Sequence, residues 1–179
     1  MEPQFSFQIL RYLLLRRSTQ GFTLAELLVV VVIMTILASI SIPALLGQAA
    51  KARESSGKMA IGLVNRAQAR YRTENNRFAD SFDALAIGAG LTGSTSSVSQ
   101  AYAYQLASSN IVTETSIIAS ASNTADRSYT GGNLMYQNSA SEIVIVPKMC
   151  ESDEPDVGVP PSVVFTAVGI DCPSNYHEP

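Results

Sequence analysis

A single apolar stretch, residues 24–46, constrains what this chain can fold into more than any other feature. From residue 27 to residue 46 it holds twenty residues without a charge, which is long enough to cross a bilayer as an α-helix. The one carboxylate in the stretch is Glu26. An ionised, unpaired glutamate near the end of such a span costs about 2.5 to 3.5 kcal/mol or more. Glu26 therefore needs a cation, a proton or a protein interior.

The residues just before the stretch suggest a source for the cation. Arg16 and Arg17 precede Gly21 and Phe22. A cut after Gly21 would create an ammonium group on Phe22, one helical turn from Glu26 in the same chain and equally within reach of a neighbouring chain. The cut would therefore supply the cation that the Glu26 carboxylate requires.

The segment GFTLAELLVV, residues 21–30, resembles the type III signal of type IV prepilins. That signal has a basic leader, a glycine, an aromatic residue, and a glutamate fifth after the cut. The resemblance implies cleavage between Gly21 and Phe22 by prepilin peptidase, which also methylates the new amino group of Phe22. It further implies that Glu26 pairs with an N-terminal amine during filament assembly.

Two further positions bear on this resemblance. Pro43 sits where these pilins commonly have a helix-bending proline, and Thr35 stands where many have a glycine. The segment RAQARYRTENNRFA, residues 66–79, resembles the same region of cyanobacterial-type pilins. A second segment, outside the signal, thus supports the resemblance to this family.

Beyond residue 46 the pattern becomes amphipathic. Ala60, Val64, Ala67 and Tyr71 recur at helical spacing, which predicts a core-facing stripe, while basic side chains including Arg72 are predicted to line other faces. The predicted division is a leader over residues 1–21, a membrane or filament-core half-helix over 22–46, an amphipathic half-helix over 47–77, and a globular head over 78–179. An ordinary secretory signal is the alternative reading of the N-terminus, although its apolar region would normally be shorter, about 7 to 15 residues.

The head is predicted to be mainly β. Phe78 and Phe82 are expected to anchor the loop after the helix, with Asp80 or Ser81 capping a short turn. Alternating β-branched and aromatic residues predict strands at 101–106, 110–119, 142–146 and 162–168, whereas 88–100 and 123–133 are predicted to be surface loops. Strands packed on one long helix make an α+β head, which in pilins is the globular domain.

The head contains two cysteines, Cys150 and Cys172. Pairing them would close a loop of about twenty residues and contribute about 3 kcal/mol in the chain-entropy model. With His177 they make a poor zinc set, because structural zinc usually takes four protein ligands. A disulfide is therefore expected in an exported chain, with two free thiols as the alternative. In pilins the segment bounded by these cysteines, residues 150–172, forms the D-region.

Charge is divided unevenly along the chain. Residues 22–77 carry seven Lys/Arg against three Asp/Glu, and residues 78–179 carry two against eleven, so the net charges are +4 and −9. An acidic head disfavours a direct nucleic-acid partner, because phosphates would be repelled. Opposite potentials favour packing of the head of one subunit on the stalk of another. Basic residues flank the apolar stretch on both sides, so the cysteines decide the orientation: a cytoplasmic N-terminus and an external head.

No pattern predicts a catalytic residue, a cofactor or a metal. Residues 88–93 form a formal GxGxxG, but no helix pattern follows it, so a loop is expected. The acidic cluster at residues 151–156 is interpreted as a solvated loop, with a calcium site as the alternative. His177 is predicted to be an exposed tail residue.

The sequence therefore favours a structural subunit of a type IV pilus. Its expected partners are further copies of itself in a homopolymeric filament, prepilin peptidase, the pilus assembly platform and, before assembly, the inner membrane; the mature location would be an extracellular pilus. A pseudopilin of a type II secretion system shares the N-terminal signal and is the alternative. A monomeric anchored binding domain or enzyme would leave Glu26 unexplained.

Overall fold

The computed structural model describes residues 21–88, 90–99, 101–155 and 158–179. The predicted leader, apart from Gly21, lies outside these residues. The chain divides into two compact units, the first ending at Leu45 and the second comprising Leu46–Pro179. Each unit is described by itself below.

One long helix, α2 (Leu24–Asn75), contributes to both units. It passes through Pro43 without an assigned break. It ends where Asn76 adopts a left-handed φ of 56° and its N–H donates to the Arg72 carbonyl at 2.9 Å, a common way of closing a helix. By length and hydropathy its first half could cross a membrane.

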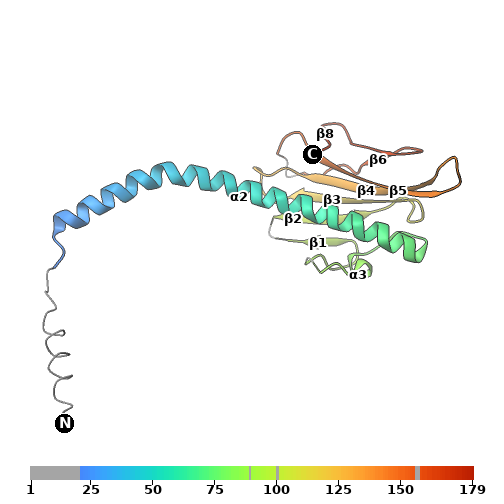
Figure 1. The fold of residues 1–179 in the computed structure, drawn as a ribbon, viewed down its shortest axis with the longest axis horizontal. Coiled ribbons are helices and arrows are strands. Elements are labelled where there is room, and N and C mark those ends of the chain that lie inside the picture. Colours follow the sequence, from blue (N-terminus) through green and yellow to red (C-terminus); the bar gives the residue numbers. More distant parts are fainter. Residues whose placement is uncertain (1–20, 89, 100, 156–157) are drawn as a thin grey trace, which may run out of the picture. The chain divides into compact units, whose positions relative to one another are not determined.

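The second unit is built on one antiparallel sheet with strand order β1-β2-β3-β4-β5-β8 (Figure 1). Its strands are β1 (Ser96–Val98), β2 (Tyr102–Ala107), β3 (Glu114–Ala121), β4 (Tyr129–Gln137), β5 (Ile143–Ser152) and β8 (Tyr176–His177). A short helix, α3 (Phe82–Leu85), precedes the sheet, and a two-stranded ribbon of β6 (Val164–Phe165) and β7 (Ile170–Asp171) lies between β5 and β8 in the chain. The predicted α+β fold, a long helix packed on an antiparallel sheet, is confirmed.

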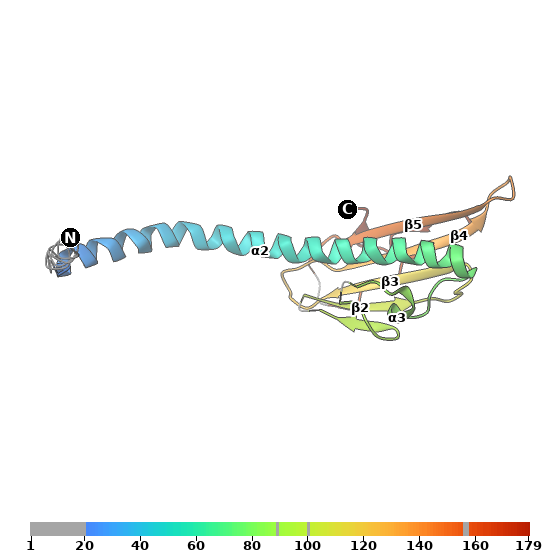
Figure 2. The ribbon, with the colours of Figure 1, turned by 60° about the horizontal axis from the view of Figure 1, so that its bottom comes forward.

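The second half of α2 covers one face of this sheet (Figure 2). Ile61 and Val64 are fully buried against the tyrosines of β2 and β4. At Gly57 a Cβ atom would lie 2.9 Å from the Tyr102 ring, so only glycine lets the helix approach this closely. The main core of the head lies between the helix and the sheet.

The opposite face of the sheet is covered by the segment between the cysteines. Leu134, Cys150, Val163 and Ile170 form a second buried cluster there. Two adjacent glycines in β4 show that the helix covers one face of the sheet and the disulfide-bounded segment covers the other. A Cβ atom on Gly131 would lie 2.6 Å from Ile61 Cγ2 of the helix, and one on Gly132 would lie 2.9 Å from Val163 Cγ2. Strand β4 is therefore packed on both faces.

This strand corrects the sequence prediction. Residues 123–133 were expected to be a surface loop, yet Tyr129, Thr130 and Asn133 are fully buried in β4. The prediction was wrong because the glycines, which usually favour turns, here make room for closely packed neighbours, and Asn133 is buried with its amide donating to Asn65 Oδ1 at 3.3 Å. The expected loop at 88–100 likewise contains strand β1 and the buried Leu91.

Other local expectations can be compared with the structure directly. Ser81 caps α3 by accepting a hydrogen bond from the Ala84 N–H, and Phe78 and Phe82 are fully buried, so these predictions are confirmed. Arg72 was predicted to lie outside the core-facing stripe. It is instead buried, and its Nε donates to the Val112 carbonyl at 3.0 Å.

Candidate assembly and processing site

The start of α2 is closed by a reciprocal pair of side chains. The Thr23 N–H and hydroxyl donate to Glu26 Oε2 at 3.0 and 2.9 Å, and the Glu26 N–H donates to Thr23 Oγ1 at 3.2 Å. This arrangement is a capping box, in which two otherwise unpaired amide groups of the first turn are satisfied. The carboxylate also lies at the positive end of the helix dipole. Glu26 therefore has a local structural role within its own chain.

Gly21 and Phe22 lie just outside this cap. The Phe22 side chain is 80% exposed, and a Cβ atom on Gly21 would meet nothing within 4 Å. The described structure therefore has no steric need for glycine at position 21. A requirement for glycine there would have to come from another molecule that binds the segment.

No described residue of the first unit covers the apolar half of α2. Every large apolar side chain between residues 24 and 46 is at least 45% exposed. Exposed apolar surface of this extent marks contact with lipid or with other proteins. Within this half, the Thr35 and Ser39 hydroxyls donate to the carbonyls of Val32 and Ile36, so these polar groups are satisfied inside the helix. The bend expected at Pro43 stays a prediction.

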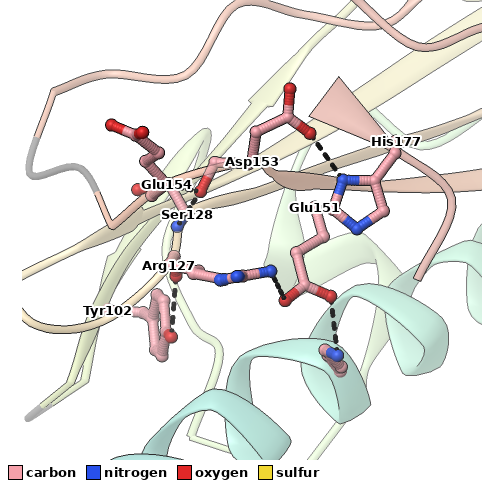
Figure 3. A network of polar contacts seen from close by, with 9 residues as sticks. Tyr102, Arg127, Ser128, Glu151, Asp153, Glu154 and His177 are labelled. Atoms are coloured by element: carbon pink, nitrogen blue, oxygen red, sulfur yellow. Dashed lines mark hydrogen bonds and ion pairs between the residues drawn. The ribbon is translucent and has the colours of Figure 1, made fainter. Parts of the chain in front are cut away.

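In the head, ion pairs join α2 to the sheet and its loops (Figure 3). The carboxylate of Glu151, nearly buried, accepts from Lys58 Nζ at 2.7 Å and from Arg127 at 3.0 Å. The fully buried Asp126 binds Arg53 through two hydrogen bonds, at 2.7 and 3.1 Å. The expected complementarity between basic stalk and acidic head is thus partly used within one subunit.

Tyrosines pack beneath these ion pairs. The Tyr102 hydroxyl donates to the Arg127 carbonyl at 2.9 Å, and Lys58 Nζ lies 5.7 Å from the centre of the Tyr129 ring. The Tyr129 hydroxyl is buried and has no hydrogen-bond partner within ordinary distance among the described residues. Burial raises the pKa of both phenols well above the usual range.

Cys150 and Cys172 are joined by a disulfide. Beside it, His177 belongs to strand β8, and its Nδ1 lies 2.7 Å from Asp153 Oδ1 (Figure 3). His177 is exposed, as predicted, but it lies in a strand and has a carboxylate partner. Among the residues that the structure describes, no three His, Cys, Asp or Glu side chains converge on a point that could hold a metal ion. The carboxylates of Glu151 and Asp153 are occupied by protein partners instead.

Comparison with known families agrees with this geometry. Residues 16–42 match the model of the prokaryotic N-terminal methylation motif. Residues 54–173, about two thirds of the chain, match the model described as type IV pilin-like G and H. The chain belongs to this family. The chain is therefore pilin-like and carries the N-terminal methylation motif of prepilins.

Two relatives of this pilin-like chain are type II secretion system core proteins G. The protein from Aeromonas hydrophila is 40% identical over 63 residues, and that from Klebsiella michiganensis is 41% identical over 63 residues. Each match covers 35% of this chain and 44% of the relative, so less than half of either relative is spanned. No solved structure matches the chain.

The sequence predictions named Glu26 but missed its partner Thr23. The spacing Thr-x-x-Glu before an apolar run was present in the sequence and is the usual signal of a capping box. The ion pairs of Asp126 and Glu151 had no comparable signal, because the helix cations that bind them, Arg53 and Lys58, lie 73 and 93 residues away in the chain.

Proposed function

We propose that this chain is a structural subunit of a type IV pilus, anchored by α2 in the inner membrane and then assembled with copies of itself into a helical filament. The observation that carries the proposal is the uncovered apolar half of α2. Apolar surface removed from water contributes about 25 cal/mol per Å², so this half is stabilised only in lipid or against other apolar helices. A filament core built from such helices would hold subunits together without covalent links.

The processing step belongs to the same proposal. Prepilin peptidase would cut between Gly21 and Phe22 and methylate the Phe22 amine. The absence of any steric need for glycine at position 21 supports recognition of Gly21 by an outside molecule. The head would then lie outside the inner membrane, in the compartment where its disulfide is stable. Mass spectrometry of the native protein tests this step: the mature chain should begin at a methylated Phe22.

In assembly, Glu26 would pair with the N-terminal amine of a neighbouring subunit and so set the register. An unpaired charge in apolar surroundings is costly, which would exclude subunits placed out of register. The capping box supplies a competing explanation, because Glu26 could be needed only to close its own helix. The two explanations differ in whether the negative charge matters.

Substitution of Glu26 separates them. Glu26→Gln keeps an oxygen that accepts from Thr23, since glutamine also serves in capping boxes, but it removes the charge. Glu26→Ala removes both. If the charge sets register, both variants should accumulate and be cleaved but fail to form filaments. Normal filaments from Glu26→Gln together with none from Glu26→Ala would show that Glu26 is needed only to cap its own helix, and would refute pairing with the amine.

A pseudopilin of a type II secretion system is the second candidate, and the names of the two relatives favour it. The disulfide-bounded C-terminal segment and the six-stranded sheet support the pilus instead. A clean deletion distinguishes them. Loss of surface filaments with intact secretion supports the pilus, whereas retention of secreted proteins in the periplasm without loss of surface filaments supports the pseudopilin.

A further inference from the structure

The positive charges of the head are already used within the head. Among the described residues 78–179, Arg127 pairs with Glu151 and Lys148 with Glu178. Two cations of α2, Arg53 and Lys58, are likewise bound to head carboxylates. Charges that remain without a strong partner are therefore of particular interest, because they are available to another molecule.

Three arginines on the outer side of the helix remain available. Arg66 and Arg70 are exposed and lie 140° and 180° around the helix from the buried Ile61, taking 100° per residue. Arg77 is exposed just after the helix ends. Arg70 approaches Glu74 only at 3.9 Å with both side chains mostly exposed, and Arg66 and Arg77 have no carboxylate partner among the described residues. We call Arg66, Arg70 and Arg77 the basic face.

Two carboxylates of the disulfide-bounded segment remain available in the same way. Glu154, just beyond β5, and Asp171, in β7, are exposed and have no cationic partner in the described part of the chain. In Figure 3 the Glu154 side chain points away from the network around Glu151. We call Glu154 and Asp171 the acidic pair.

These two surfaces lie on opposite faces of one sheet. The helix that carries the basic face covers the Gly131 side, whereas the segment that carries the acidic pair covers the Gly132 side. A subunit can therefore not bring its own two surfaces together. Contacts between two different, complementary surfaces generate open chains of subunits rather than closed dimers.

We propose that the basic face of one subunit binds the acidic pair of a second copy of this chain. The inference rests on the proposed function, since it names the contact between heads that would accompany packing of the apolar half-helices. Electrostatic complementarity of this kind fixes orientation and excludes wrong partners more than it adds affinity. The contact would orient each head relative to the next.

Charge reversal on each side, alone and combined, tests this contact in full-length protein expressed in a strain lacking the native gene. Arg66→Glu with Arg70→Glu should lower filament yield about tenfold, a loss of about 1.4 kcal/mol, and Glu154→Arg with Asp171→Arg should do the same. The combined fourfold variant restores attraction with the signs exchanged. It should return filament yield to within about twofold of the unchanged chain, which corresponds to about 0.4 kcal/mol.

Asp80→Arg is the matched control, because Asp80 is an exposed carboxylate outside the disulfide-bounded segment. It should leave filaments unchanged. Protein level and protease resistance must be equal in all variants, and rescue by the combined variant cannot arise from a folding defect. Filaments that form equally in every variant, or a fourfold variant no better than either double variant, would overturn the contact and leave the pilus proposal standing. Absence of filaments from the unchanged chain would overturn both.

Discussion

The two halves of α2 have opposite relations to the rest of the chain. In the half that ends at Leu46 every large apolar side chain is exposed, whereas in the other half Gly57, Ile61 and Val64 are buried by tyrosines and glycines of the sheet. The first half is apolar apart from Glu26 and a few hydroxyl side chains, and the second is amphipathic, with Arg66 and Arg70 exposed on the side away from the sheet. The comparison shows that one continuous helix can serve two environments. Its second half packs on the sheet of the same chain, and its first half is suited to lipid or to the apolar helices of other molecules. Substitutions in the two halves should therefore have separable effects.

The largest effect is expected from a charge in the uncovered half. Val32→Asp would place a carboxylate inside the apolar stretch, at a cost of about 2.5 to 3.5 kcal/mol in a bilayer and more in a filament core. Filaments should be lost, while thermal unfolding of the head, followed by circular dichroism, should be unchanged. Val32→Leu is the control and should assemble normally. A head that melts earlier in Val32→Asp would contradict the separation of the two halves.

The disulfide should give the converse result. Cys172→Ser removes the closure of a loop with a sequence separation of 22 residues, and we expect a loss of about 3 kcal/mol in the free energy of unfolding of the head. Membrane anchoring through the first half should persist, measured by fractionation. Reducing agent should lower the stability of the unchanged chain and have no effect on the variant. Equal stability of the two proteins under oxidising conditions would count against the bridge.

Glycines in the covered half sharpen the comparison further. Gly131→Ala would bring a methyl group within 2.6 Å of Ile61 Cγ2 and 3.0 Å of the Lys148 carbonyl, so the helix or the strand must shift. A loss of about 1 to 3 kcal/mol is expected in denaturant unfolding.

Gly62→Ala is the matched control on the helix itself. Its Cβ atom would come no closer than 4.0 Å to the Arg66 side chain. Because alanine favours a helix by about 0.8 to 1 kcal/mol over glycine, this change should raise stability. If both alanines had the same effect, close packing at β4 would not explain the requirement for glycine.

The smallest expected effects concern the buried tyrosines. Tyr102→Phe removes the hydrogen bond to the Arg127 carbonyl and should lower the free energy of unfolding by about 1 kcal/mol. Tyr129→Phe removes a buried hydroxyl that has no partner among the described residues, so it should be neutral or stabilising. Urea unfolding of the two variants measures the difference, and the reverse order would show that the Tyr129 hydroxyl is the one that is hydrogen-bonded.

The same tyrosines predict the behaviour of the head at alkaline pH. Burial raises the pKa of Tyr102 and Tyr129 in the folded state above the value of about 10 in the unfolded chain. The unfolded state therefore releases protons first, and stability is retained below about pH 10 and lost as the pH rises further. The double variant Tyr102→Phe with Tyr129→Phe should show a shallower loss between about pH 10 and 12.

Features set by neighbouring residues were predictable from the sequence. The apolar span, the Ser81 cap, and the burial of Phe78 and Phe82 depend on short segments whose residue types have few alternatives. The pairing of the cysteines was predictable for another reason, because the head contains two and no more.

Features set by distant backbone groups were not predictable. Asn65 and Arg72 are polar, yet both are buried on the sheet side of α2. Asn65 donates to the Lys148 carbonyl of β5, and Arg72 donates to the Val112 carbonyl in the turn before β3. Gln68 similarly donates to and accepts from the backbone of Ala79. At 100° per residue all three lie within about 40° of Ile61 around the helix, so their spacing fits the sheet side. Their polarity nevertheless predicts a solvent-facing position, since the sequence does not reveal the backbone groups, 11, 40 and 83 residues away, that bind them. Strand β4 was not predicted for a similar reason. Its glycines are required by close neighbours from distant parts of the chain, Ile61 and Val163.

The position of the capping box has a consequence for maturation. Thr23 and Glu26 close the first turn with groups that all lie downstream of the Gly21–Phe22 bond. Peptidase action at that bond would release the leader without unwinding any of the helix behind it. The mature subunit would thus be ready for extraction from the bilayer with its leading turn already formed, and no refolding would separate hydrolysis from polymerisation.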